Sequence, residues 1–182
     1  MDLRSVLICA VALVAVPAFA QTEGDRIMLA DPLDEPEYYC FDLTGFRDSL
    51  VLDDPLQAHT CKAMGRGPDQ LFAFEGEKIQ VVGYDRCLQA AGTAGRTVAG
   101  ASILARECTD TGRSSAMQRF ELGSSGKLRI KDTDLCVGVG ASSTPANGPS
   151  HIWRALIVLD CDADDSLSKW QIGLNQSDQQ AG

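Results

Sequence analysis

Six cysteines in the body of the chain carry the most legible chemistry of the sequence, because thiols either form disulfides or bind metal ions. They make an even set once Cys9, which lies in an apolar N-terminal run, is set apart: Cys40, Cys61, Cys87, Cys108, Cys136 and Cys161. Structural metal sites usually show a Cys-x-x-Cys pair or a pair of histidines nearby, and the sequence has neither. The cysteines therefore favour disulfides, although six thiols allow fifteen different pairings.

A threefold internal repeat selects one of these pairings. Cut at a spacing of about fifty residues, the chain gives three pieces, each with an opening cysteine, an apolar stretch that ends at a second cysteine, and an aromatic residue beyond it. The aromatic residues are Phe72, Phe120 and Trp170. Equivalent pieces should carry equivalent bridges, so the predicted pairs are Cys40–Cys61, Cys87–Cys108 and Cys136–Cys161. Each closed loop should stabilise the fold by roughly 3 kcal/mol through the unfolded chain.

Apolar and polar residues alternate in short runs, which is the pattern of β-strands. Leu56 and Ala58 alternate with Gln57 and His59, and no sustained helical stripe follows the N-terminal run. This pattern, with turn residues between the runs, predicts an all-β domain. The expected boundaries are an N-terminal tail at 21–37, a domain at 38–174 with repeats at about 38–84, 85–133 and 134–174, and a C-terminal tail at 175–182. Only the third repeat has an additional loop rich in Gly, Ser and Pro, at 141–150.

The N-terminus is typical of a secretory signal peptide. Residues 6–16 are apolar or small, and Ala18-Phe19-Ala20 has the small-x-small form of a cleavage site. We therefore predict a signal peptide over residues 1–20, with cleavage near Ala20-Gln21 and a secreted or periplasmic location. A membrane anchor is the alternative, but the run is short for a span, and no later segment is long and apolar enough to cross a bilayer.

Charge and motifs exclude several classes of function. The formal net charge of −9 disfavours nucleic acid and anionic lipid as partners. The sequence lacks the Gly-x-Ser-x-Gly, His-Glu-x-x-His and Walker motifs of common enzymes. The acidic run at 160–165 is spaced like the start of a calcium loop, but it lacks the glycine at the sixth position. The expectation is a protein without catalytic activity, cofactor or metal site.

The repeated motifs resemble those of the ricin-type (ricin B-like) β-trefoil lectins. The resemblance rests on three copies of a cysteine opening, an apolar strand that ends at a cysteine, and a Gln-x-aromatic element; the first copy has Cys40-Phe41-Asp42 and Gln70-Leu71-Phe72. It covers about residues 38–173. It implies an all-β β-trefoil, with three pseudo-repeats of four strands around a pseudo-threefold axis and one disulfide inside each repeat.

The same resemblance implies a shallow sugar site on each repeat. A carboxylate after the first cysteine accepts sugar hydroxyls, polar groups near the second cysteine donate to them, and a ring covers the apolar face of the sugar. In the first repeat the matching positions hold Asp42, Gln57, His59 and Asp69. The second repeat has Gln89 in place of the acid and the third has Gly138, so the sugar site is expected on the first repeat.

Two functions fit this pattern. The first is a lectin-like, carbohydrate-binding protein that recognises a glycan or glycoconjugate through the first lobe. The alternative is a non-catalytic protein-interaction trefoil, an accessory or toxin-carrier subunit with degenerate sugar sites. Ile157 and Leu159 favour the alternative: with Trp153 they make a candidate partner patch on the third repeat, unless the segment 27–29 covers it. A protease-inhibitor trefoil would need a rigid exposed loop, which the sequence does not reveal.

Overall fold

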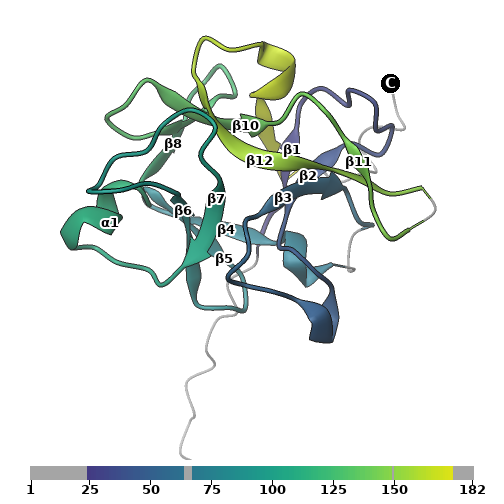
Figure 1. Cartoon of the computed structure of the whole chain (residues 1–182), viewed down its shortest axis with the longest axis horizontal. Helices are drawn as coiled ribbons and strands as arrows, with labels where there is room; N and C mark the ends of the chain where they lie inside the picture. The colour runs from purple at the N-terminus through teal and green to yellow at the C-terminus, as the bar shows by residue number, and fades with distance from the viewer. Residues whose placement is uncertain (1–23, 64–66, 149, 174–182) are drawn as a thin grey trace, which may run out of the picture.

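The computed structural model describes residues 24–63, 67–148 and 150–173, which form a β-trefoil (Figure 1). The strands are β1 (Ile27–Leu29), β2 (Tyr39–Asp42), β3 (Gln57–Thr60), β4 (Phe72–Glu75), β5 (Lys78–Val81), β6 (Arg86–Ala90), β7 (Ile103–Arg106), β8 (Phe120–Leu122), β9 (Leu128–Ile130), β10 (Leu135–Val139), β11 (Thr144–Pro145), β12 (Ile152–Asp160) and β13 (Trp170–Ile172). The short helical elements are α1 (Gly112–Ala116) and the 3-10 turns η1 (Arg47–Ser49), η2 (Pro68–Gln70) and η3 (Asp165–Leu167). The predicted all-β class is confirmed.

Two antiparallel hairpins, and a pair of strands from opposite ends of the described chain that takes the place of a third hairpin, repeat around the fold with the same register. β4 pairs with β5, β8 with β9, and β13 with β1. In each hairpin the aromatic residue that the sequence pattern singled out lies opposite an aliphatic residue: Phe72 opposite Val81, Phe120 opposite Ile130, and Trp170 opposite Leu29. All six side chains are buried. The repeat that is visible in the sequence is therefore a repeat of structure.

The third hairpin is completed by the N-terminal segment. Ile27 and Leu29 of β1 are fully buried, and Met28 lies opposite Cys40 in the way that Gln80 lies opposite Cys87. The predicted tail at 21–37 is therefore wrong for β1, and the trefoil begins before residue 38; residues 21–23 lie outside the described chain. The physical reason is that β13 needs a partner, since an unpaired strand edge leaves its N–H and C=O groups without hydrogen bonds.

The core lies where the inward faces of the three repeats meet. Phe41 follows the first cysteine and is fully buried, as are the equivalent residues Leu88 and Val137. The Phe41 ring contacts those of Phe72 and Trp170 edge to face, with centroids 5.8 Å and 4.5 Å apart. Such aromatic pairs contribute about 0.5–1.5 kcal/mol each beyond the burial of their area. The aromatic elements of the first and third repeats are therefore structural residues of the core.

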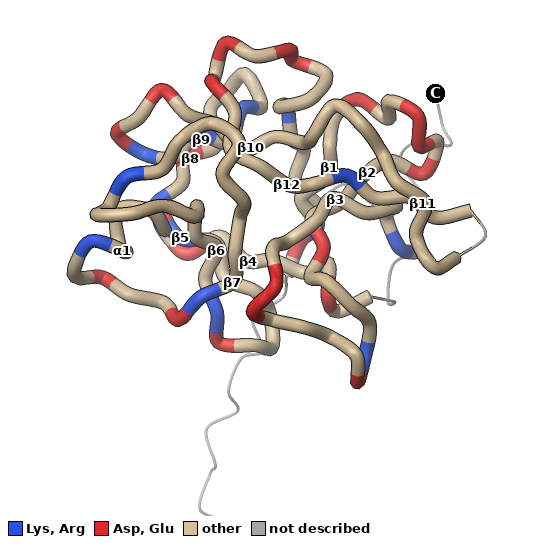
Figure 2. Tube along the Cα trace, viewed as in Figure 1, with Lys and Arg blue, Asp and Glu red and all other residues tan. Residues whose placement is uncertain are grey.

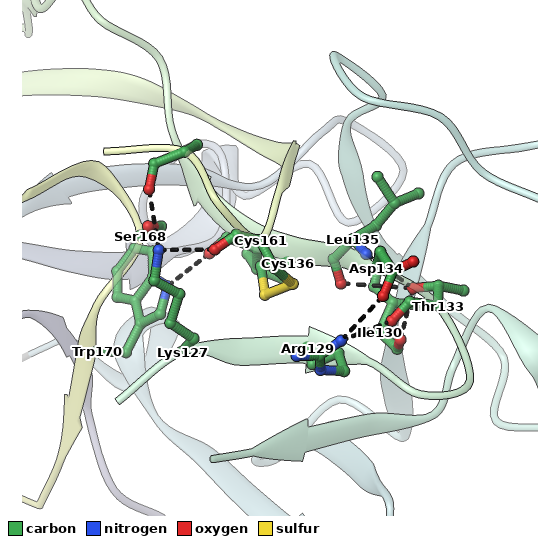
Figure 3. Close-up of a disulfide and its surroundings, with 12 residues drawn as sticks. Lys127, Arg129, Ile130, Thr133, Asp134, Leu135, Cys136, Cys161, Ser168 and Trp170 are labelled. Carbon is green, nitrogen blue, oxygen red and sulfur yellow. Dashed lines mark hydrogen bonds and ion pairs between the residues drawn. A yellow bond between two sulfur atoms is a disulfide. The ribbon is translucent and has the colours of Figure 1, made fainter. Parts of the chain in front are cut away.

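One disulfide lies inside each repeat, which confirms the predicted pairing. The bridges are Cys40–Cys61, Cys87–Cys108 and Cys136–Cys161. Figure 3 shows the third bridge with Lys127 beside it; the Lys127 ammonium donates to the carbonyl oxygens of Cys161 and Ala163 at 2.9 Å each. Each bridge joins the first strand of a repeat to a residue just beyond its antiparallel partner, β3, β7 or β12.

Strand β12 departs most from the threefold pattern. It has nine residues, whereas β3 and β7 have four each. Its first part pairs with β11 and with β3 of the first repeat, and its second part pairs with β10 of its own repeat. Figure 1 shows β11 and the start of β12 reaching past β3 at the edge of the molecule. The additional loop of the third repeat is thereby placed against the first repeat.

Charged residues occupy the periphery of the fold. Figure 2 shows acidic positions in many of the outer loops, with basic positions between them.

None of the helices in the described ranges has the length and apolar character needed to cross a bilayer. Within the same residues, no group of three or more potential ligands is arranged to hold a metal ion. The predicted signal peptide at 1–20 and C-terminal tail at 175–182 lie outside the described residues.

Candidate functional site

The register of β2 and β3 brings three of the four predicted site residues together. Asp42 lies opposite Gln57, and Cys40 lies opposite His59. Since side chains alternate along a strand, Gln57 and His59 point to the same side, away from the buried Ala58. All three line one cavity of about 530 Å³. Asp69 lies beneath it, 2% exposed, and is not among the described residues that line the cavity.

The floor of this cavity is a buried charge cluster. Asp42 is only 1% exposed; its Oδ2 accepts a hydrogen bond of 2.8 Å from Gln70 Nε2 and lies 3.1 Å from the Lys62 ammonium. Lys62 also forms an ion pair and hydrogen bond with Asp69. Asp42 Oδ1 and Asp69 Oδ1 have no hydrogen-bond partner among the described residues. Lys62 thus links two buried carboxyl groups.

Burial changes the acid–base properties of the floor. Loss of water around Asp42 raises the pKa of its carboxyl to about 7; Lys62 lowers this pKa and Asp69 raises it. Burial also lowers the pKa of His59, whose Nδ1 lies 3.1 Å from the carbonyl oxygen of Thr60. A neutral ring that donates from Nδ1 to this carbonyl leaves Nε2 as an acceptor. The site therefore contains a carboxyl that titrates near neutral pH beside an uncharged imidazole.

Aromatic side chains form the walls. Phe46, in the loop after β2, is 49% exposed, and the Lys62 ammonium lies 5.4 Å from its ring centroid. On the other side stand Trp153 and His151 of the third repeat. His151 meets His59 edge to face, with ring centroids 5.5 Å apart. His59 offers only a small ring surface to a ligand. Most of the aromatic surface comes from Phe46 in the loop after β2 and from His151 and Trp153 of the third repeat.

Trp153 belongs to this cavity and lies apart from Ile157 and Leu159, with which the sequence pattern grouped it. On β12, Trp153 lies opposite His59 of β3, whereas Ile157 and Leu159 lie opposite Gly138 and Cys136 of β10. Ile157 and Leu159 are half-buried. The segment 27–29, considered as their cover, instead forms β1 between β2 and β13.

The second and third repeats lack the carboxylate that the first repeat has at the base of its site. Gln118 Nε2 donates to Gln89 Oε1 at 3.0 Å, as Gln70 does to Asp42, but the acceptor is a neutral amide. The cavity there, of about 490 Å³, contains Arg106 where the first repeat has His59. In the third repeat a Cβ added to Gly138 would lie 2.4 Å from Leu159 Cδ1. Leu159 therefore fills the place that a carboxylate would need.

The sequence pattern did not predict three contributors to the first site: Lys62, Phe46 and the wall formed by residues 145–148 with His151 and Trp153. Lys62 directly follows Cys61, so its position near Asp42 follows from the disulfide and the strand register. Phe46 stands in an irregular loop, for which the repeat makes no prediction. The wall comes from the additional loop of the third repeat, but its contact with β3 depends on the long β12.

Comparisons with known proteins identify the fold. No family model matches the sequence, and no curated protein matches it. Among solved structures, the agglutinin from Abrus precatorius superposes with a TM-score of 0.58 at 17% identity, over 87% of this chain and 51% of that chain, so this chain spans about half of the agglutinin. The C-terminal domain of an earthworm lectin, solved as a mutant in complex with 6'-sialyllactose, superposes with a TM-score of 0.58 at 12% identity, over 83% of this chain and 98% of that domain.

A designed protein with threefold symmetry, ThreeFoil, also superposes, with a TM-score of 0.58 at 14% identity, over 84% of this chain and 99% of that protein. Identities this low speak for the fold alone. Together with the repeated strand pairs and the three bridges, they show a β-trefoil, the fold that the sequence motifs predicted.

Proposed function

We propose that this protein is an exported, lectin-like protein that binds carbohydrate in the cavity of its first lobe. One observation carries the proposal: the cavity combines a carboxylate–ammonium floor with aromatic walls, of which Phe46 is exposed and Trp153 partly exposed. Sugars present hydroxyls that both donate and accept hydrogen bonds, and C–H faces that pack on rings. Lys62, Gln57 and His59 supply the polar groups, and Phe46 and Trp153 supply the rings.

Because Asp42 is buried, its role differs from the direct sugar contact expected of a solvent-exposed carboxylate. At 1% exposure it cannot accept two sugar hydroxyls directly while Lys62 covers it. It holds Lys62 in place, and the ammonium, with three N–H donors, offers a donor to the sugar. Gln57 and His59 Nε2 then serve as the partly exposed polar partners. We propose Asp69 as a second anchor of Lys62, without sugar contact of its own.

Export is supported by the three disulfides, because such bridges form and persist in oxidising compartments. The predicted signal peptide would direct the chain to such a compartment.

The protein-interaction alternative rested on Ile157 and Leu159. Both are half-buried, and Leu159 covers Gly138, which accounts for its position within the fold. Carbohydrate binding is therefore the function that the geometry supports best.

A glycan array with the mature, oxidised protein tests this proposal, followed by titration calorimetry with a retained glycan. Replacing Gln57 with alanine should weaken binding about tenfold, since a hydrogen bond contributes about 0.5–1.5 kcal/mol and its unpaired partner costs more. The matched control is Leu104→Ala, since Leu104 lies opposite Gln89 on β7 as Gln57 lies opposite Asp42 on β3. The control should bind like the wild type. An array on which no glycan is retained, or equal loss in both variants, would overturn the proposal.

A further inference from the structure

The cavity of the first lobe has two parts that come from different repeats. Asp42, Gln57, His59 and Lys62 belong to the first repeat. The opposite wall consists of Pro145, Ala146, Asn147, Gly148, His151 and Trp153, all from the additional segment of the third repeat. The floor is charged, whereas this wall contains no Asp, Glu, Lys or Arg and is largely apolar or aromatic. A ligand that fills both parts must present a polar unit to the floor and a second unit, with an apolar face, to the wall.

Hydrogen bonds join the β12 part of the wall to the first repeat and to the segment that precedes it. Arg154, only 6% exposed, donates from Nη2 to Asp34 Oδ1 at 2.6 Å and from Nη1 to the carbonyl oxygen of Gly140 at 2.8 Å. The backbone N–H of Ile152 donates to Thr60 Oγ1 at 3.0 Å. Trp153 is thereby fixed opposite His59 in the strand register. An ordered wall loses little conformational entropy on binding, which favours its use as a binding surface.

The size of the cavity agrees with a ligand of more than one unit. Its volume of about 530 Å³ lies within the range of about 300–1,000 Å³ that is typical of clefts for drug-sized ligands. The second-lobe cavity, although similar in volume, is lined only by residues 89–114 of its own repeat. The His59–His151 contact joins floor and wall into one continuous surface in the first lobe. The two-part lining is therefore a property of the first-lobe site.

We infer that the first-lobe site selects glycans of at least two sugar units, with one unit on the Asp42–Lys62 floor and the adjoining unit on the wall of Trp153 and His151. This inference rests on the proposed function and adds the ligand class to it. Trp153 is then the specificity-determining residue: its ring packs on the second sugar and contributes nothing to the first.

Titration calorimetry with matched probes tests the inference. Methyl glycosides of galactose, mannose and N-acetylglucosamine are compared with lactose, mannobiose and chitobiose, using the full oxidised protein. At least one disaccharide should bind ten times more tightly than its methyl glycoside. Trp153→Ala should abolish this advantage while changing the Kd of the methyl glycoside less than twofold. Trp153→Phe should keep most of the advantage, and Ile157→Ala, on the same face of β12 but opposite Gly138, should keep all of it.

The outcomes separate this inference from the proposed function. Equal affinity of the wild type for a methyl glycoside and its disaccharide would overturn the inference and leave carbohydrate binding in place. An equal weakening of both probes by Trp153→Ala would also overturn it, because the ring would then contact the first unit. Should Trp153→Ala unfold, loss of the disaccharide advantage in Asn147→Ala, on the same wall, supports the inference, and its retention overturns it. Absence of binding to every probe and every array glycan would overturn both.

Discussion

Gln70 donates a hydrogen bond of 2.8 Å to Asp42, and this bond fixes a carboxyl group that is almost fully removed from water. The same amide accepts from the backbone N–H of Lys62 at 2.9 Å and donates to the carbonyl oxygen of Thr60 at 3.1 Å. Gln118 repeats these three contacts in the second lobe, with Gln89, Thr109 and Glu107. The glutamine therefore positions the residue at the base of each site. That residue is the acidic Asp42 in the first lobe and the neutral Gln89 in the second.

The buried carboxyl of Asp42 predicts a pH dependence of stability. Its pKa is about 7 in the folded protein and about 3.9 in the unfolded chain, so the folded state binds the additional proton between these values. The free energy of unfolding should therefore fall as pH rises from 4 to 7, by up to about 4 kcal/mol from this group. Asp42→Asn should remove this part of the slope. Urea denaturation at several pH values measures it, and parallel curves for both proteins would contradict the assignment.

The β1 strand predicts that the N-terminal segment is needed for stability. Leu29 is fully buried opposite Trp170, so Leu29→Ala should cost about 2–5 kcal/mol of unfolding free energy. Val98, which is 69% exposed, provides the control, and Val98→Ala should change stability by less than about 0.5 kcal/mol. Both are measured by urea denaturation. If Leu29→Ala were as mild as Val98→Ala, the segment would be a tail after all.

The filled third lobe predicts a specific steric conflict. In Gly138→Ala the new methyl group would meet Leu159 Cδ1 at 2.4 Å and the carbonyl oxygen of Leu167 at 2.7 Å, and overpacking of this kind costs about 1–3 kcal/mol. Gly140→Ala is the matched control, since its methyl would lie at an ordinary 3.7 Å from Ala155. Thermal unfolding compares the two. Combining Gly138→Ala with Leu159→Ala should cost less than the sum of the single changes; strict additivity would show that Leu159 does not occupy this place.

The parts of this structure that the sequence predicts are the parts that repeat. The disulfides, the alternation of apolar and polar residues seen around Ala58, and the buried aromatic positions recur three times. A pattern that could arise by chance in one repeat is therefore checked against the two other repeats. Asp42, Gln57 and His59 are predictable because the family resemblance marks their positions and the strand register brings them together. β1 is not, because it has three residues in an acidic, proline-containing segment, where local pattern gives no strand signal. The wall with Trp153 is not predictable either, because it depends on pairing between distant strands, which no local rule reveals.

The most direct measurement of the central claim uses the two tryptophans of the chain as reporters. Trp153 lines the first-lobe cavity, whereas Trp170 is 2% exposed, and its indole N–H donates to the carbonyl oxygen of Val137 at 2.8 Å. In ¹H–¹⁵N spectra recorded during titration with a glycan retained on the array, the Trp153 indole and the Gln57 side-chain amide should shift in a saturable way. The Trp170 indole and the Gln89 amide should stay in place. Saturable shifts at Gln89 and Arg106, with Trp153 and Gln57 unmoved, would contradict the account, because the glycan would then occupy the second lobe.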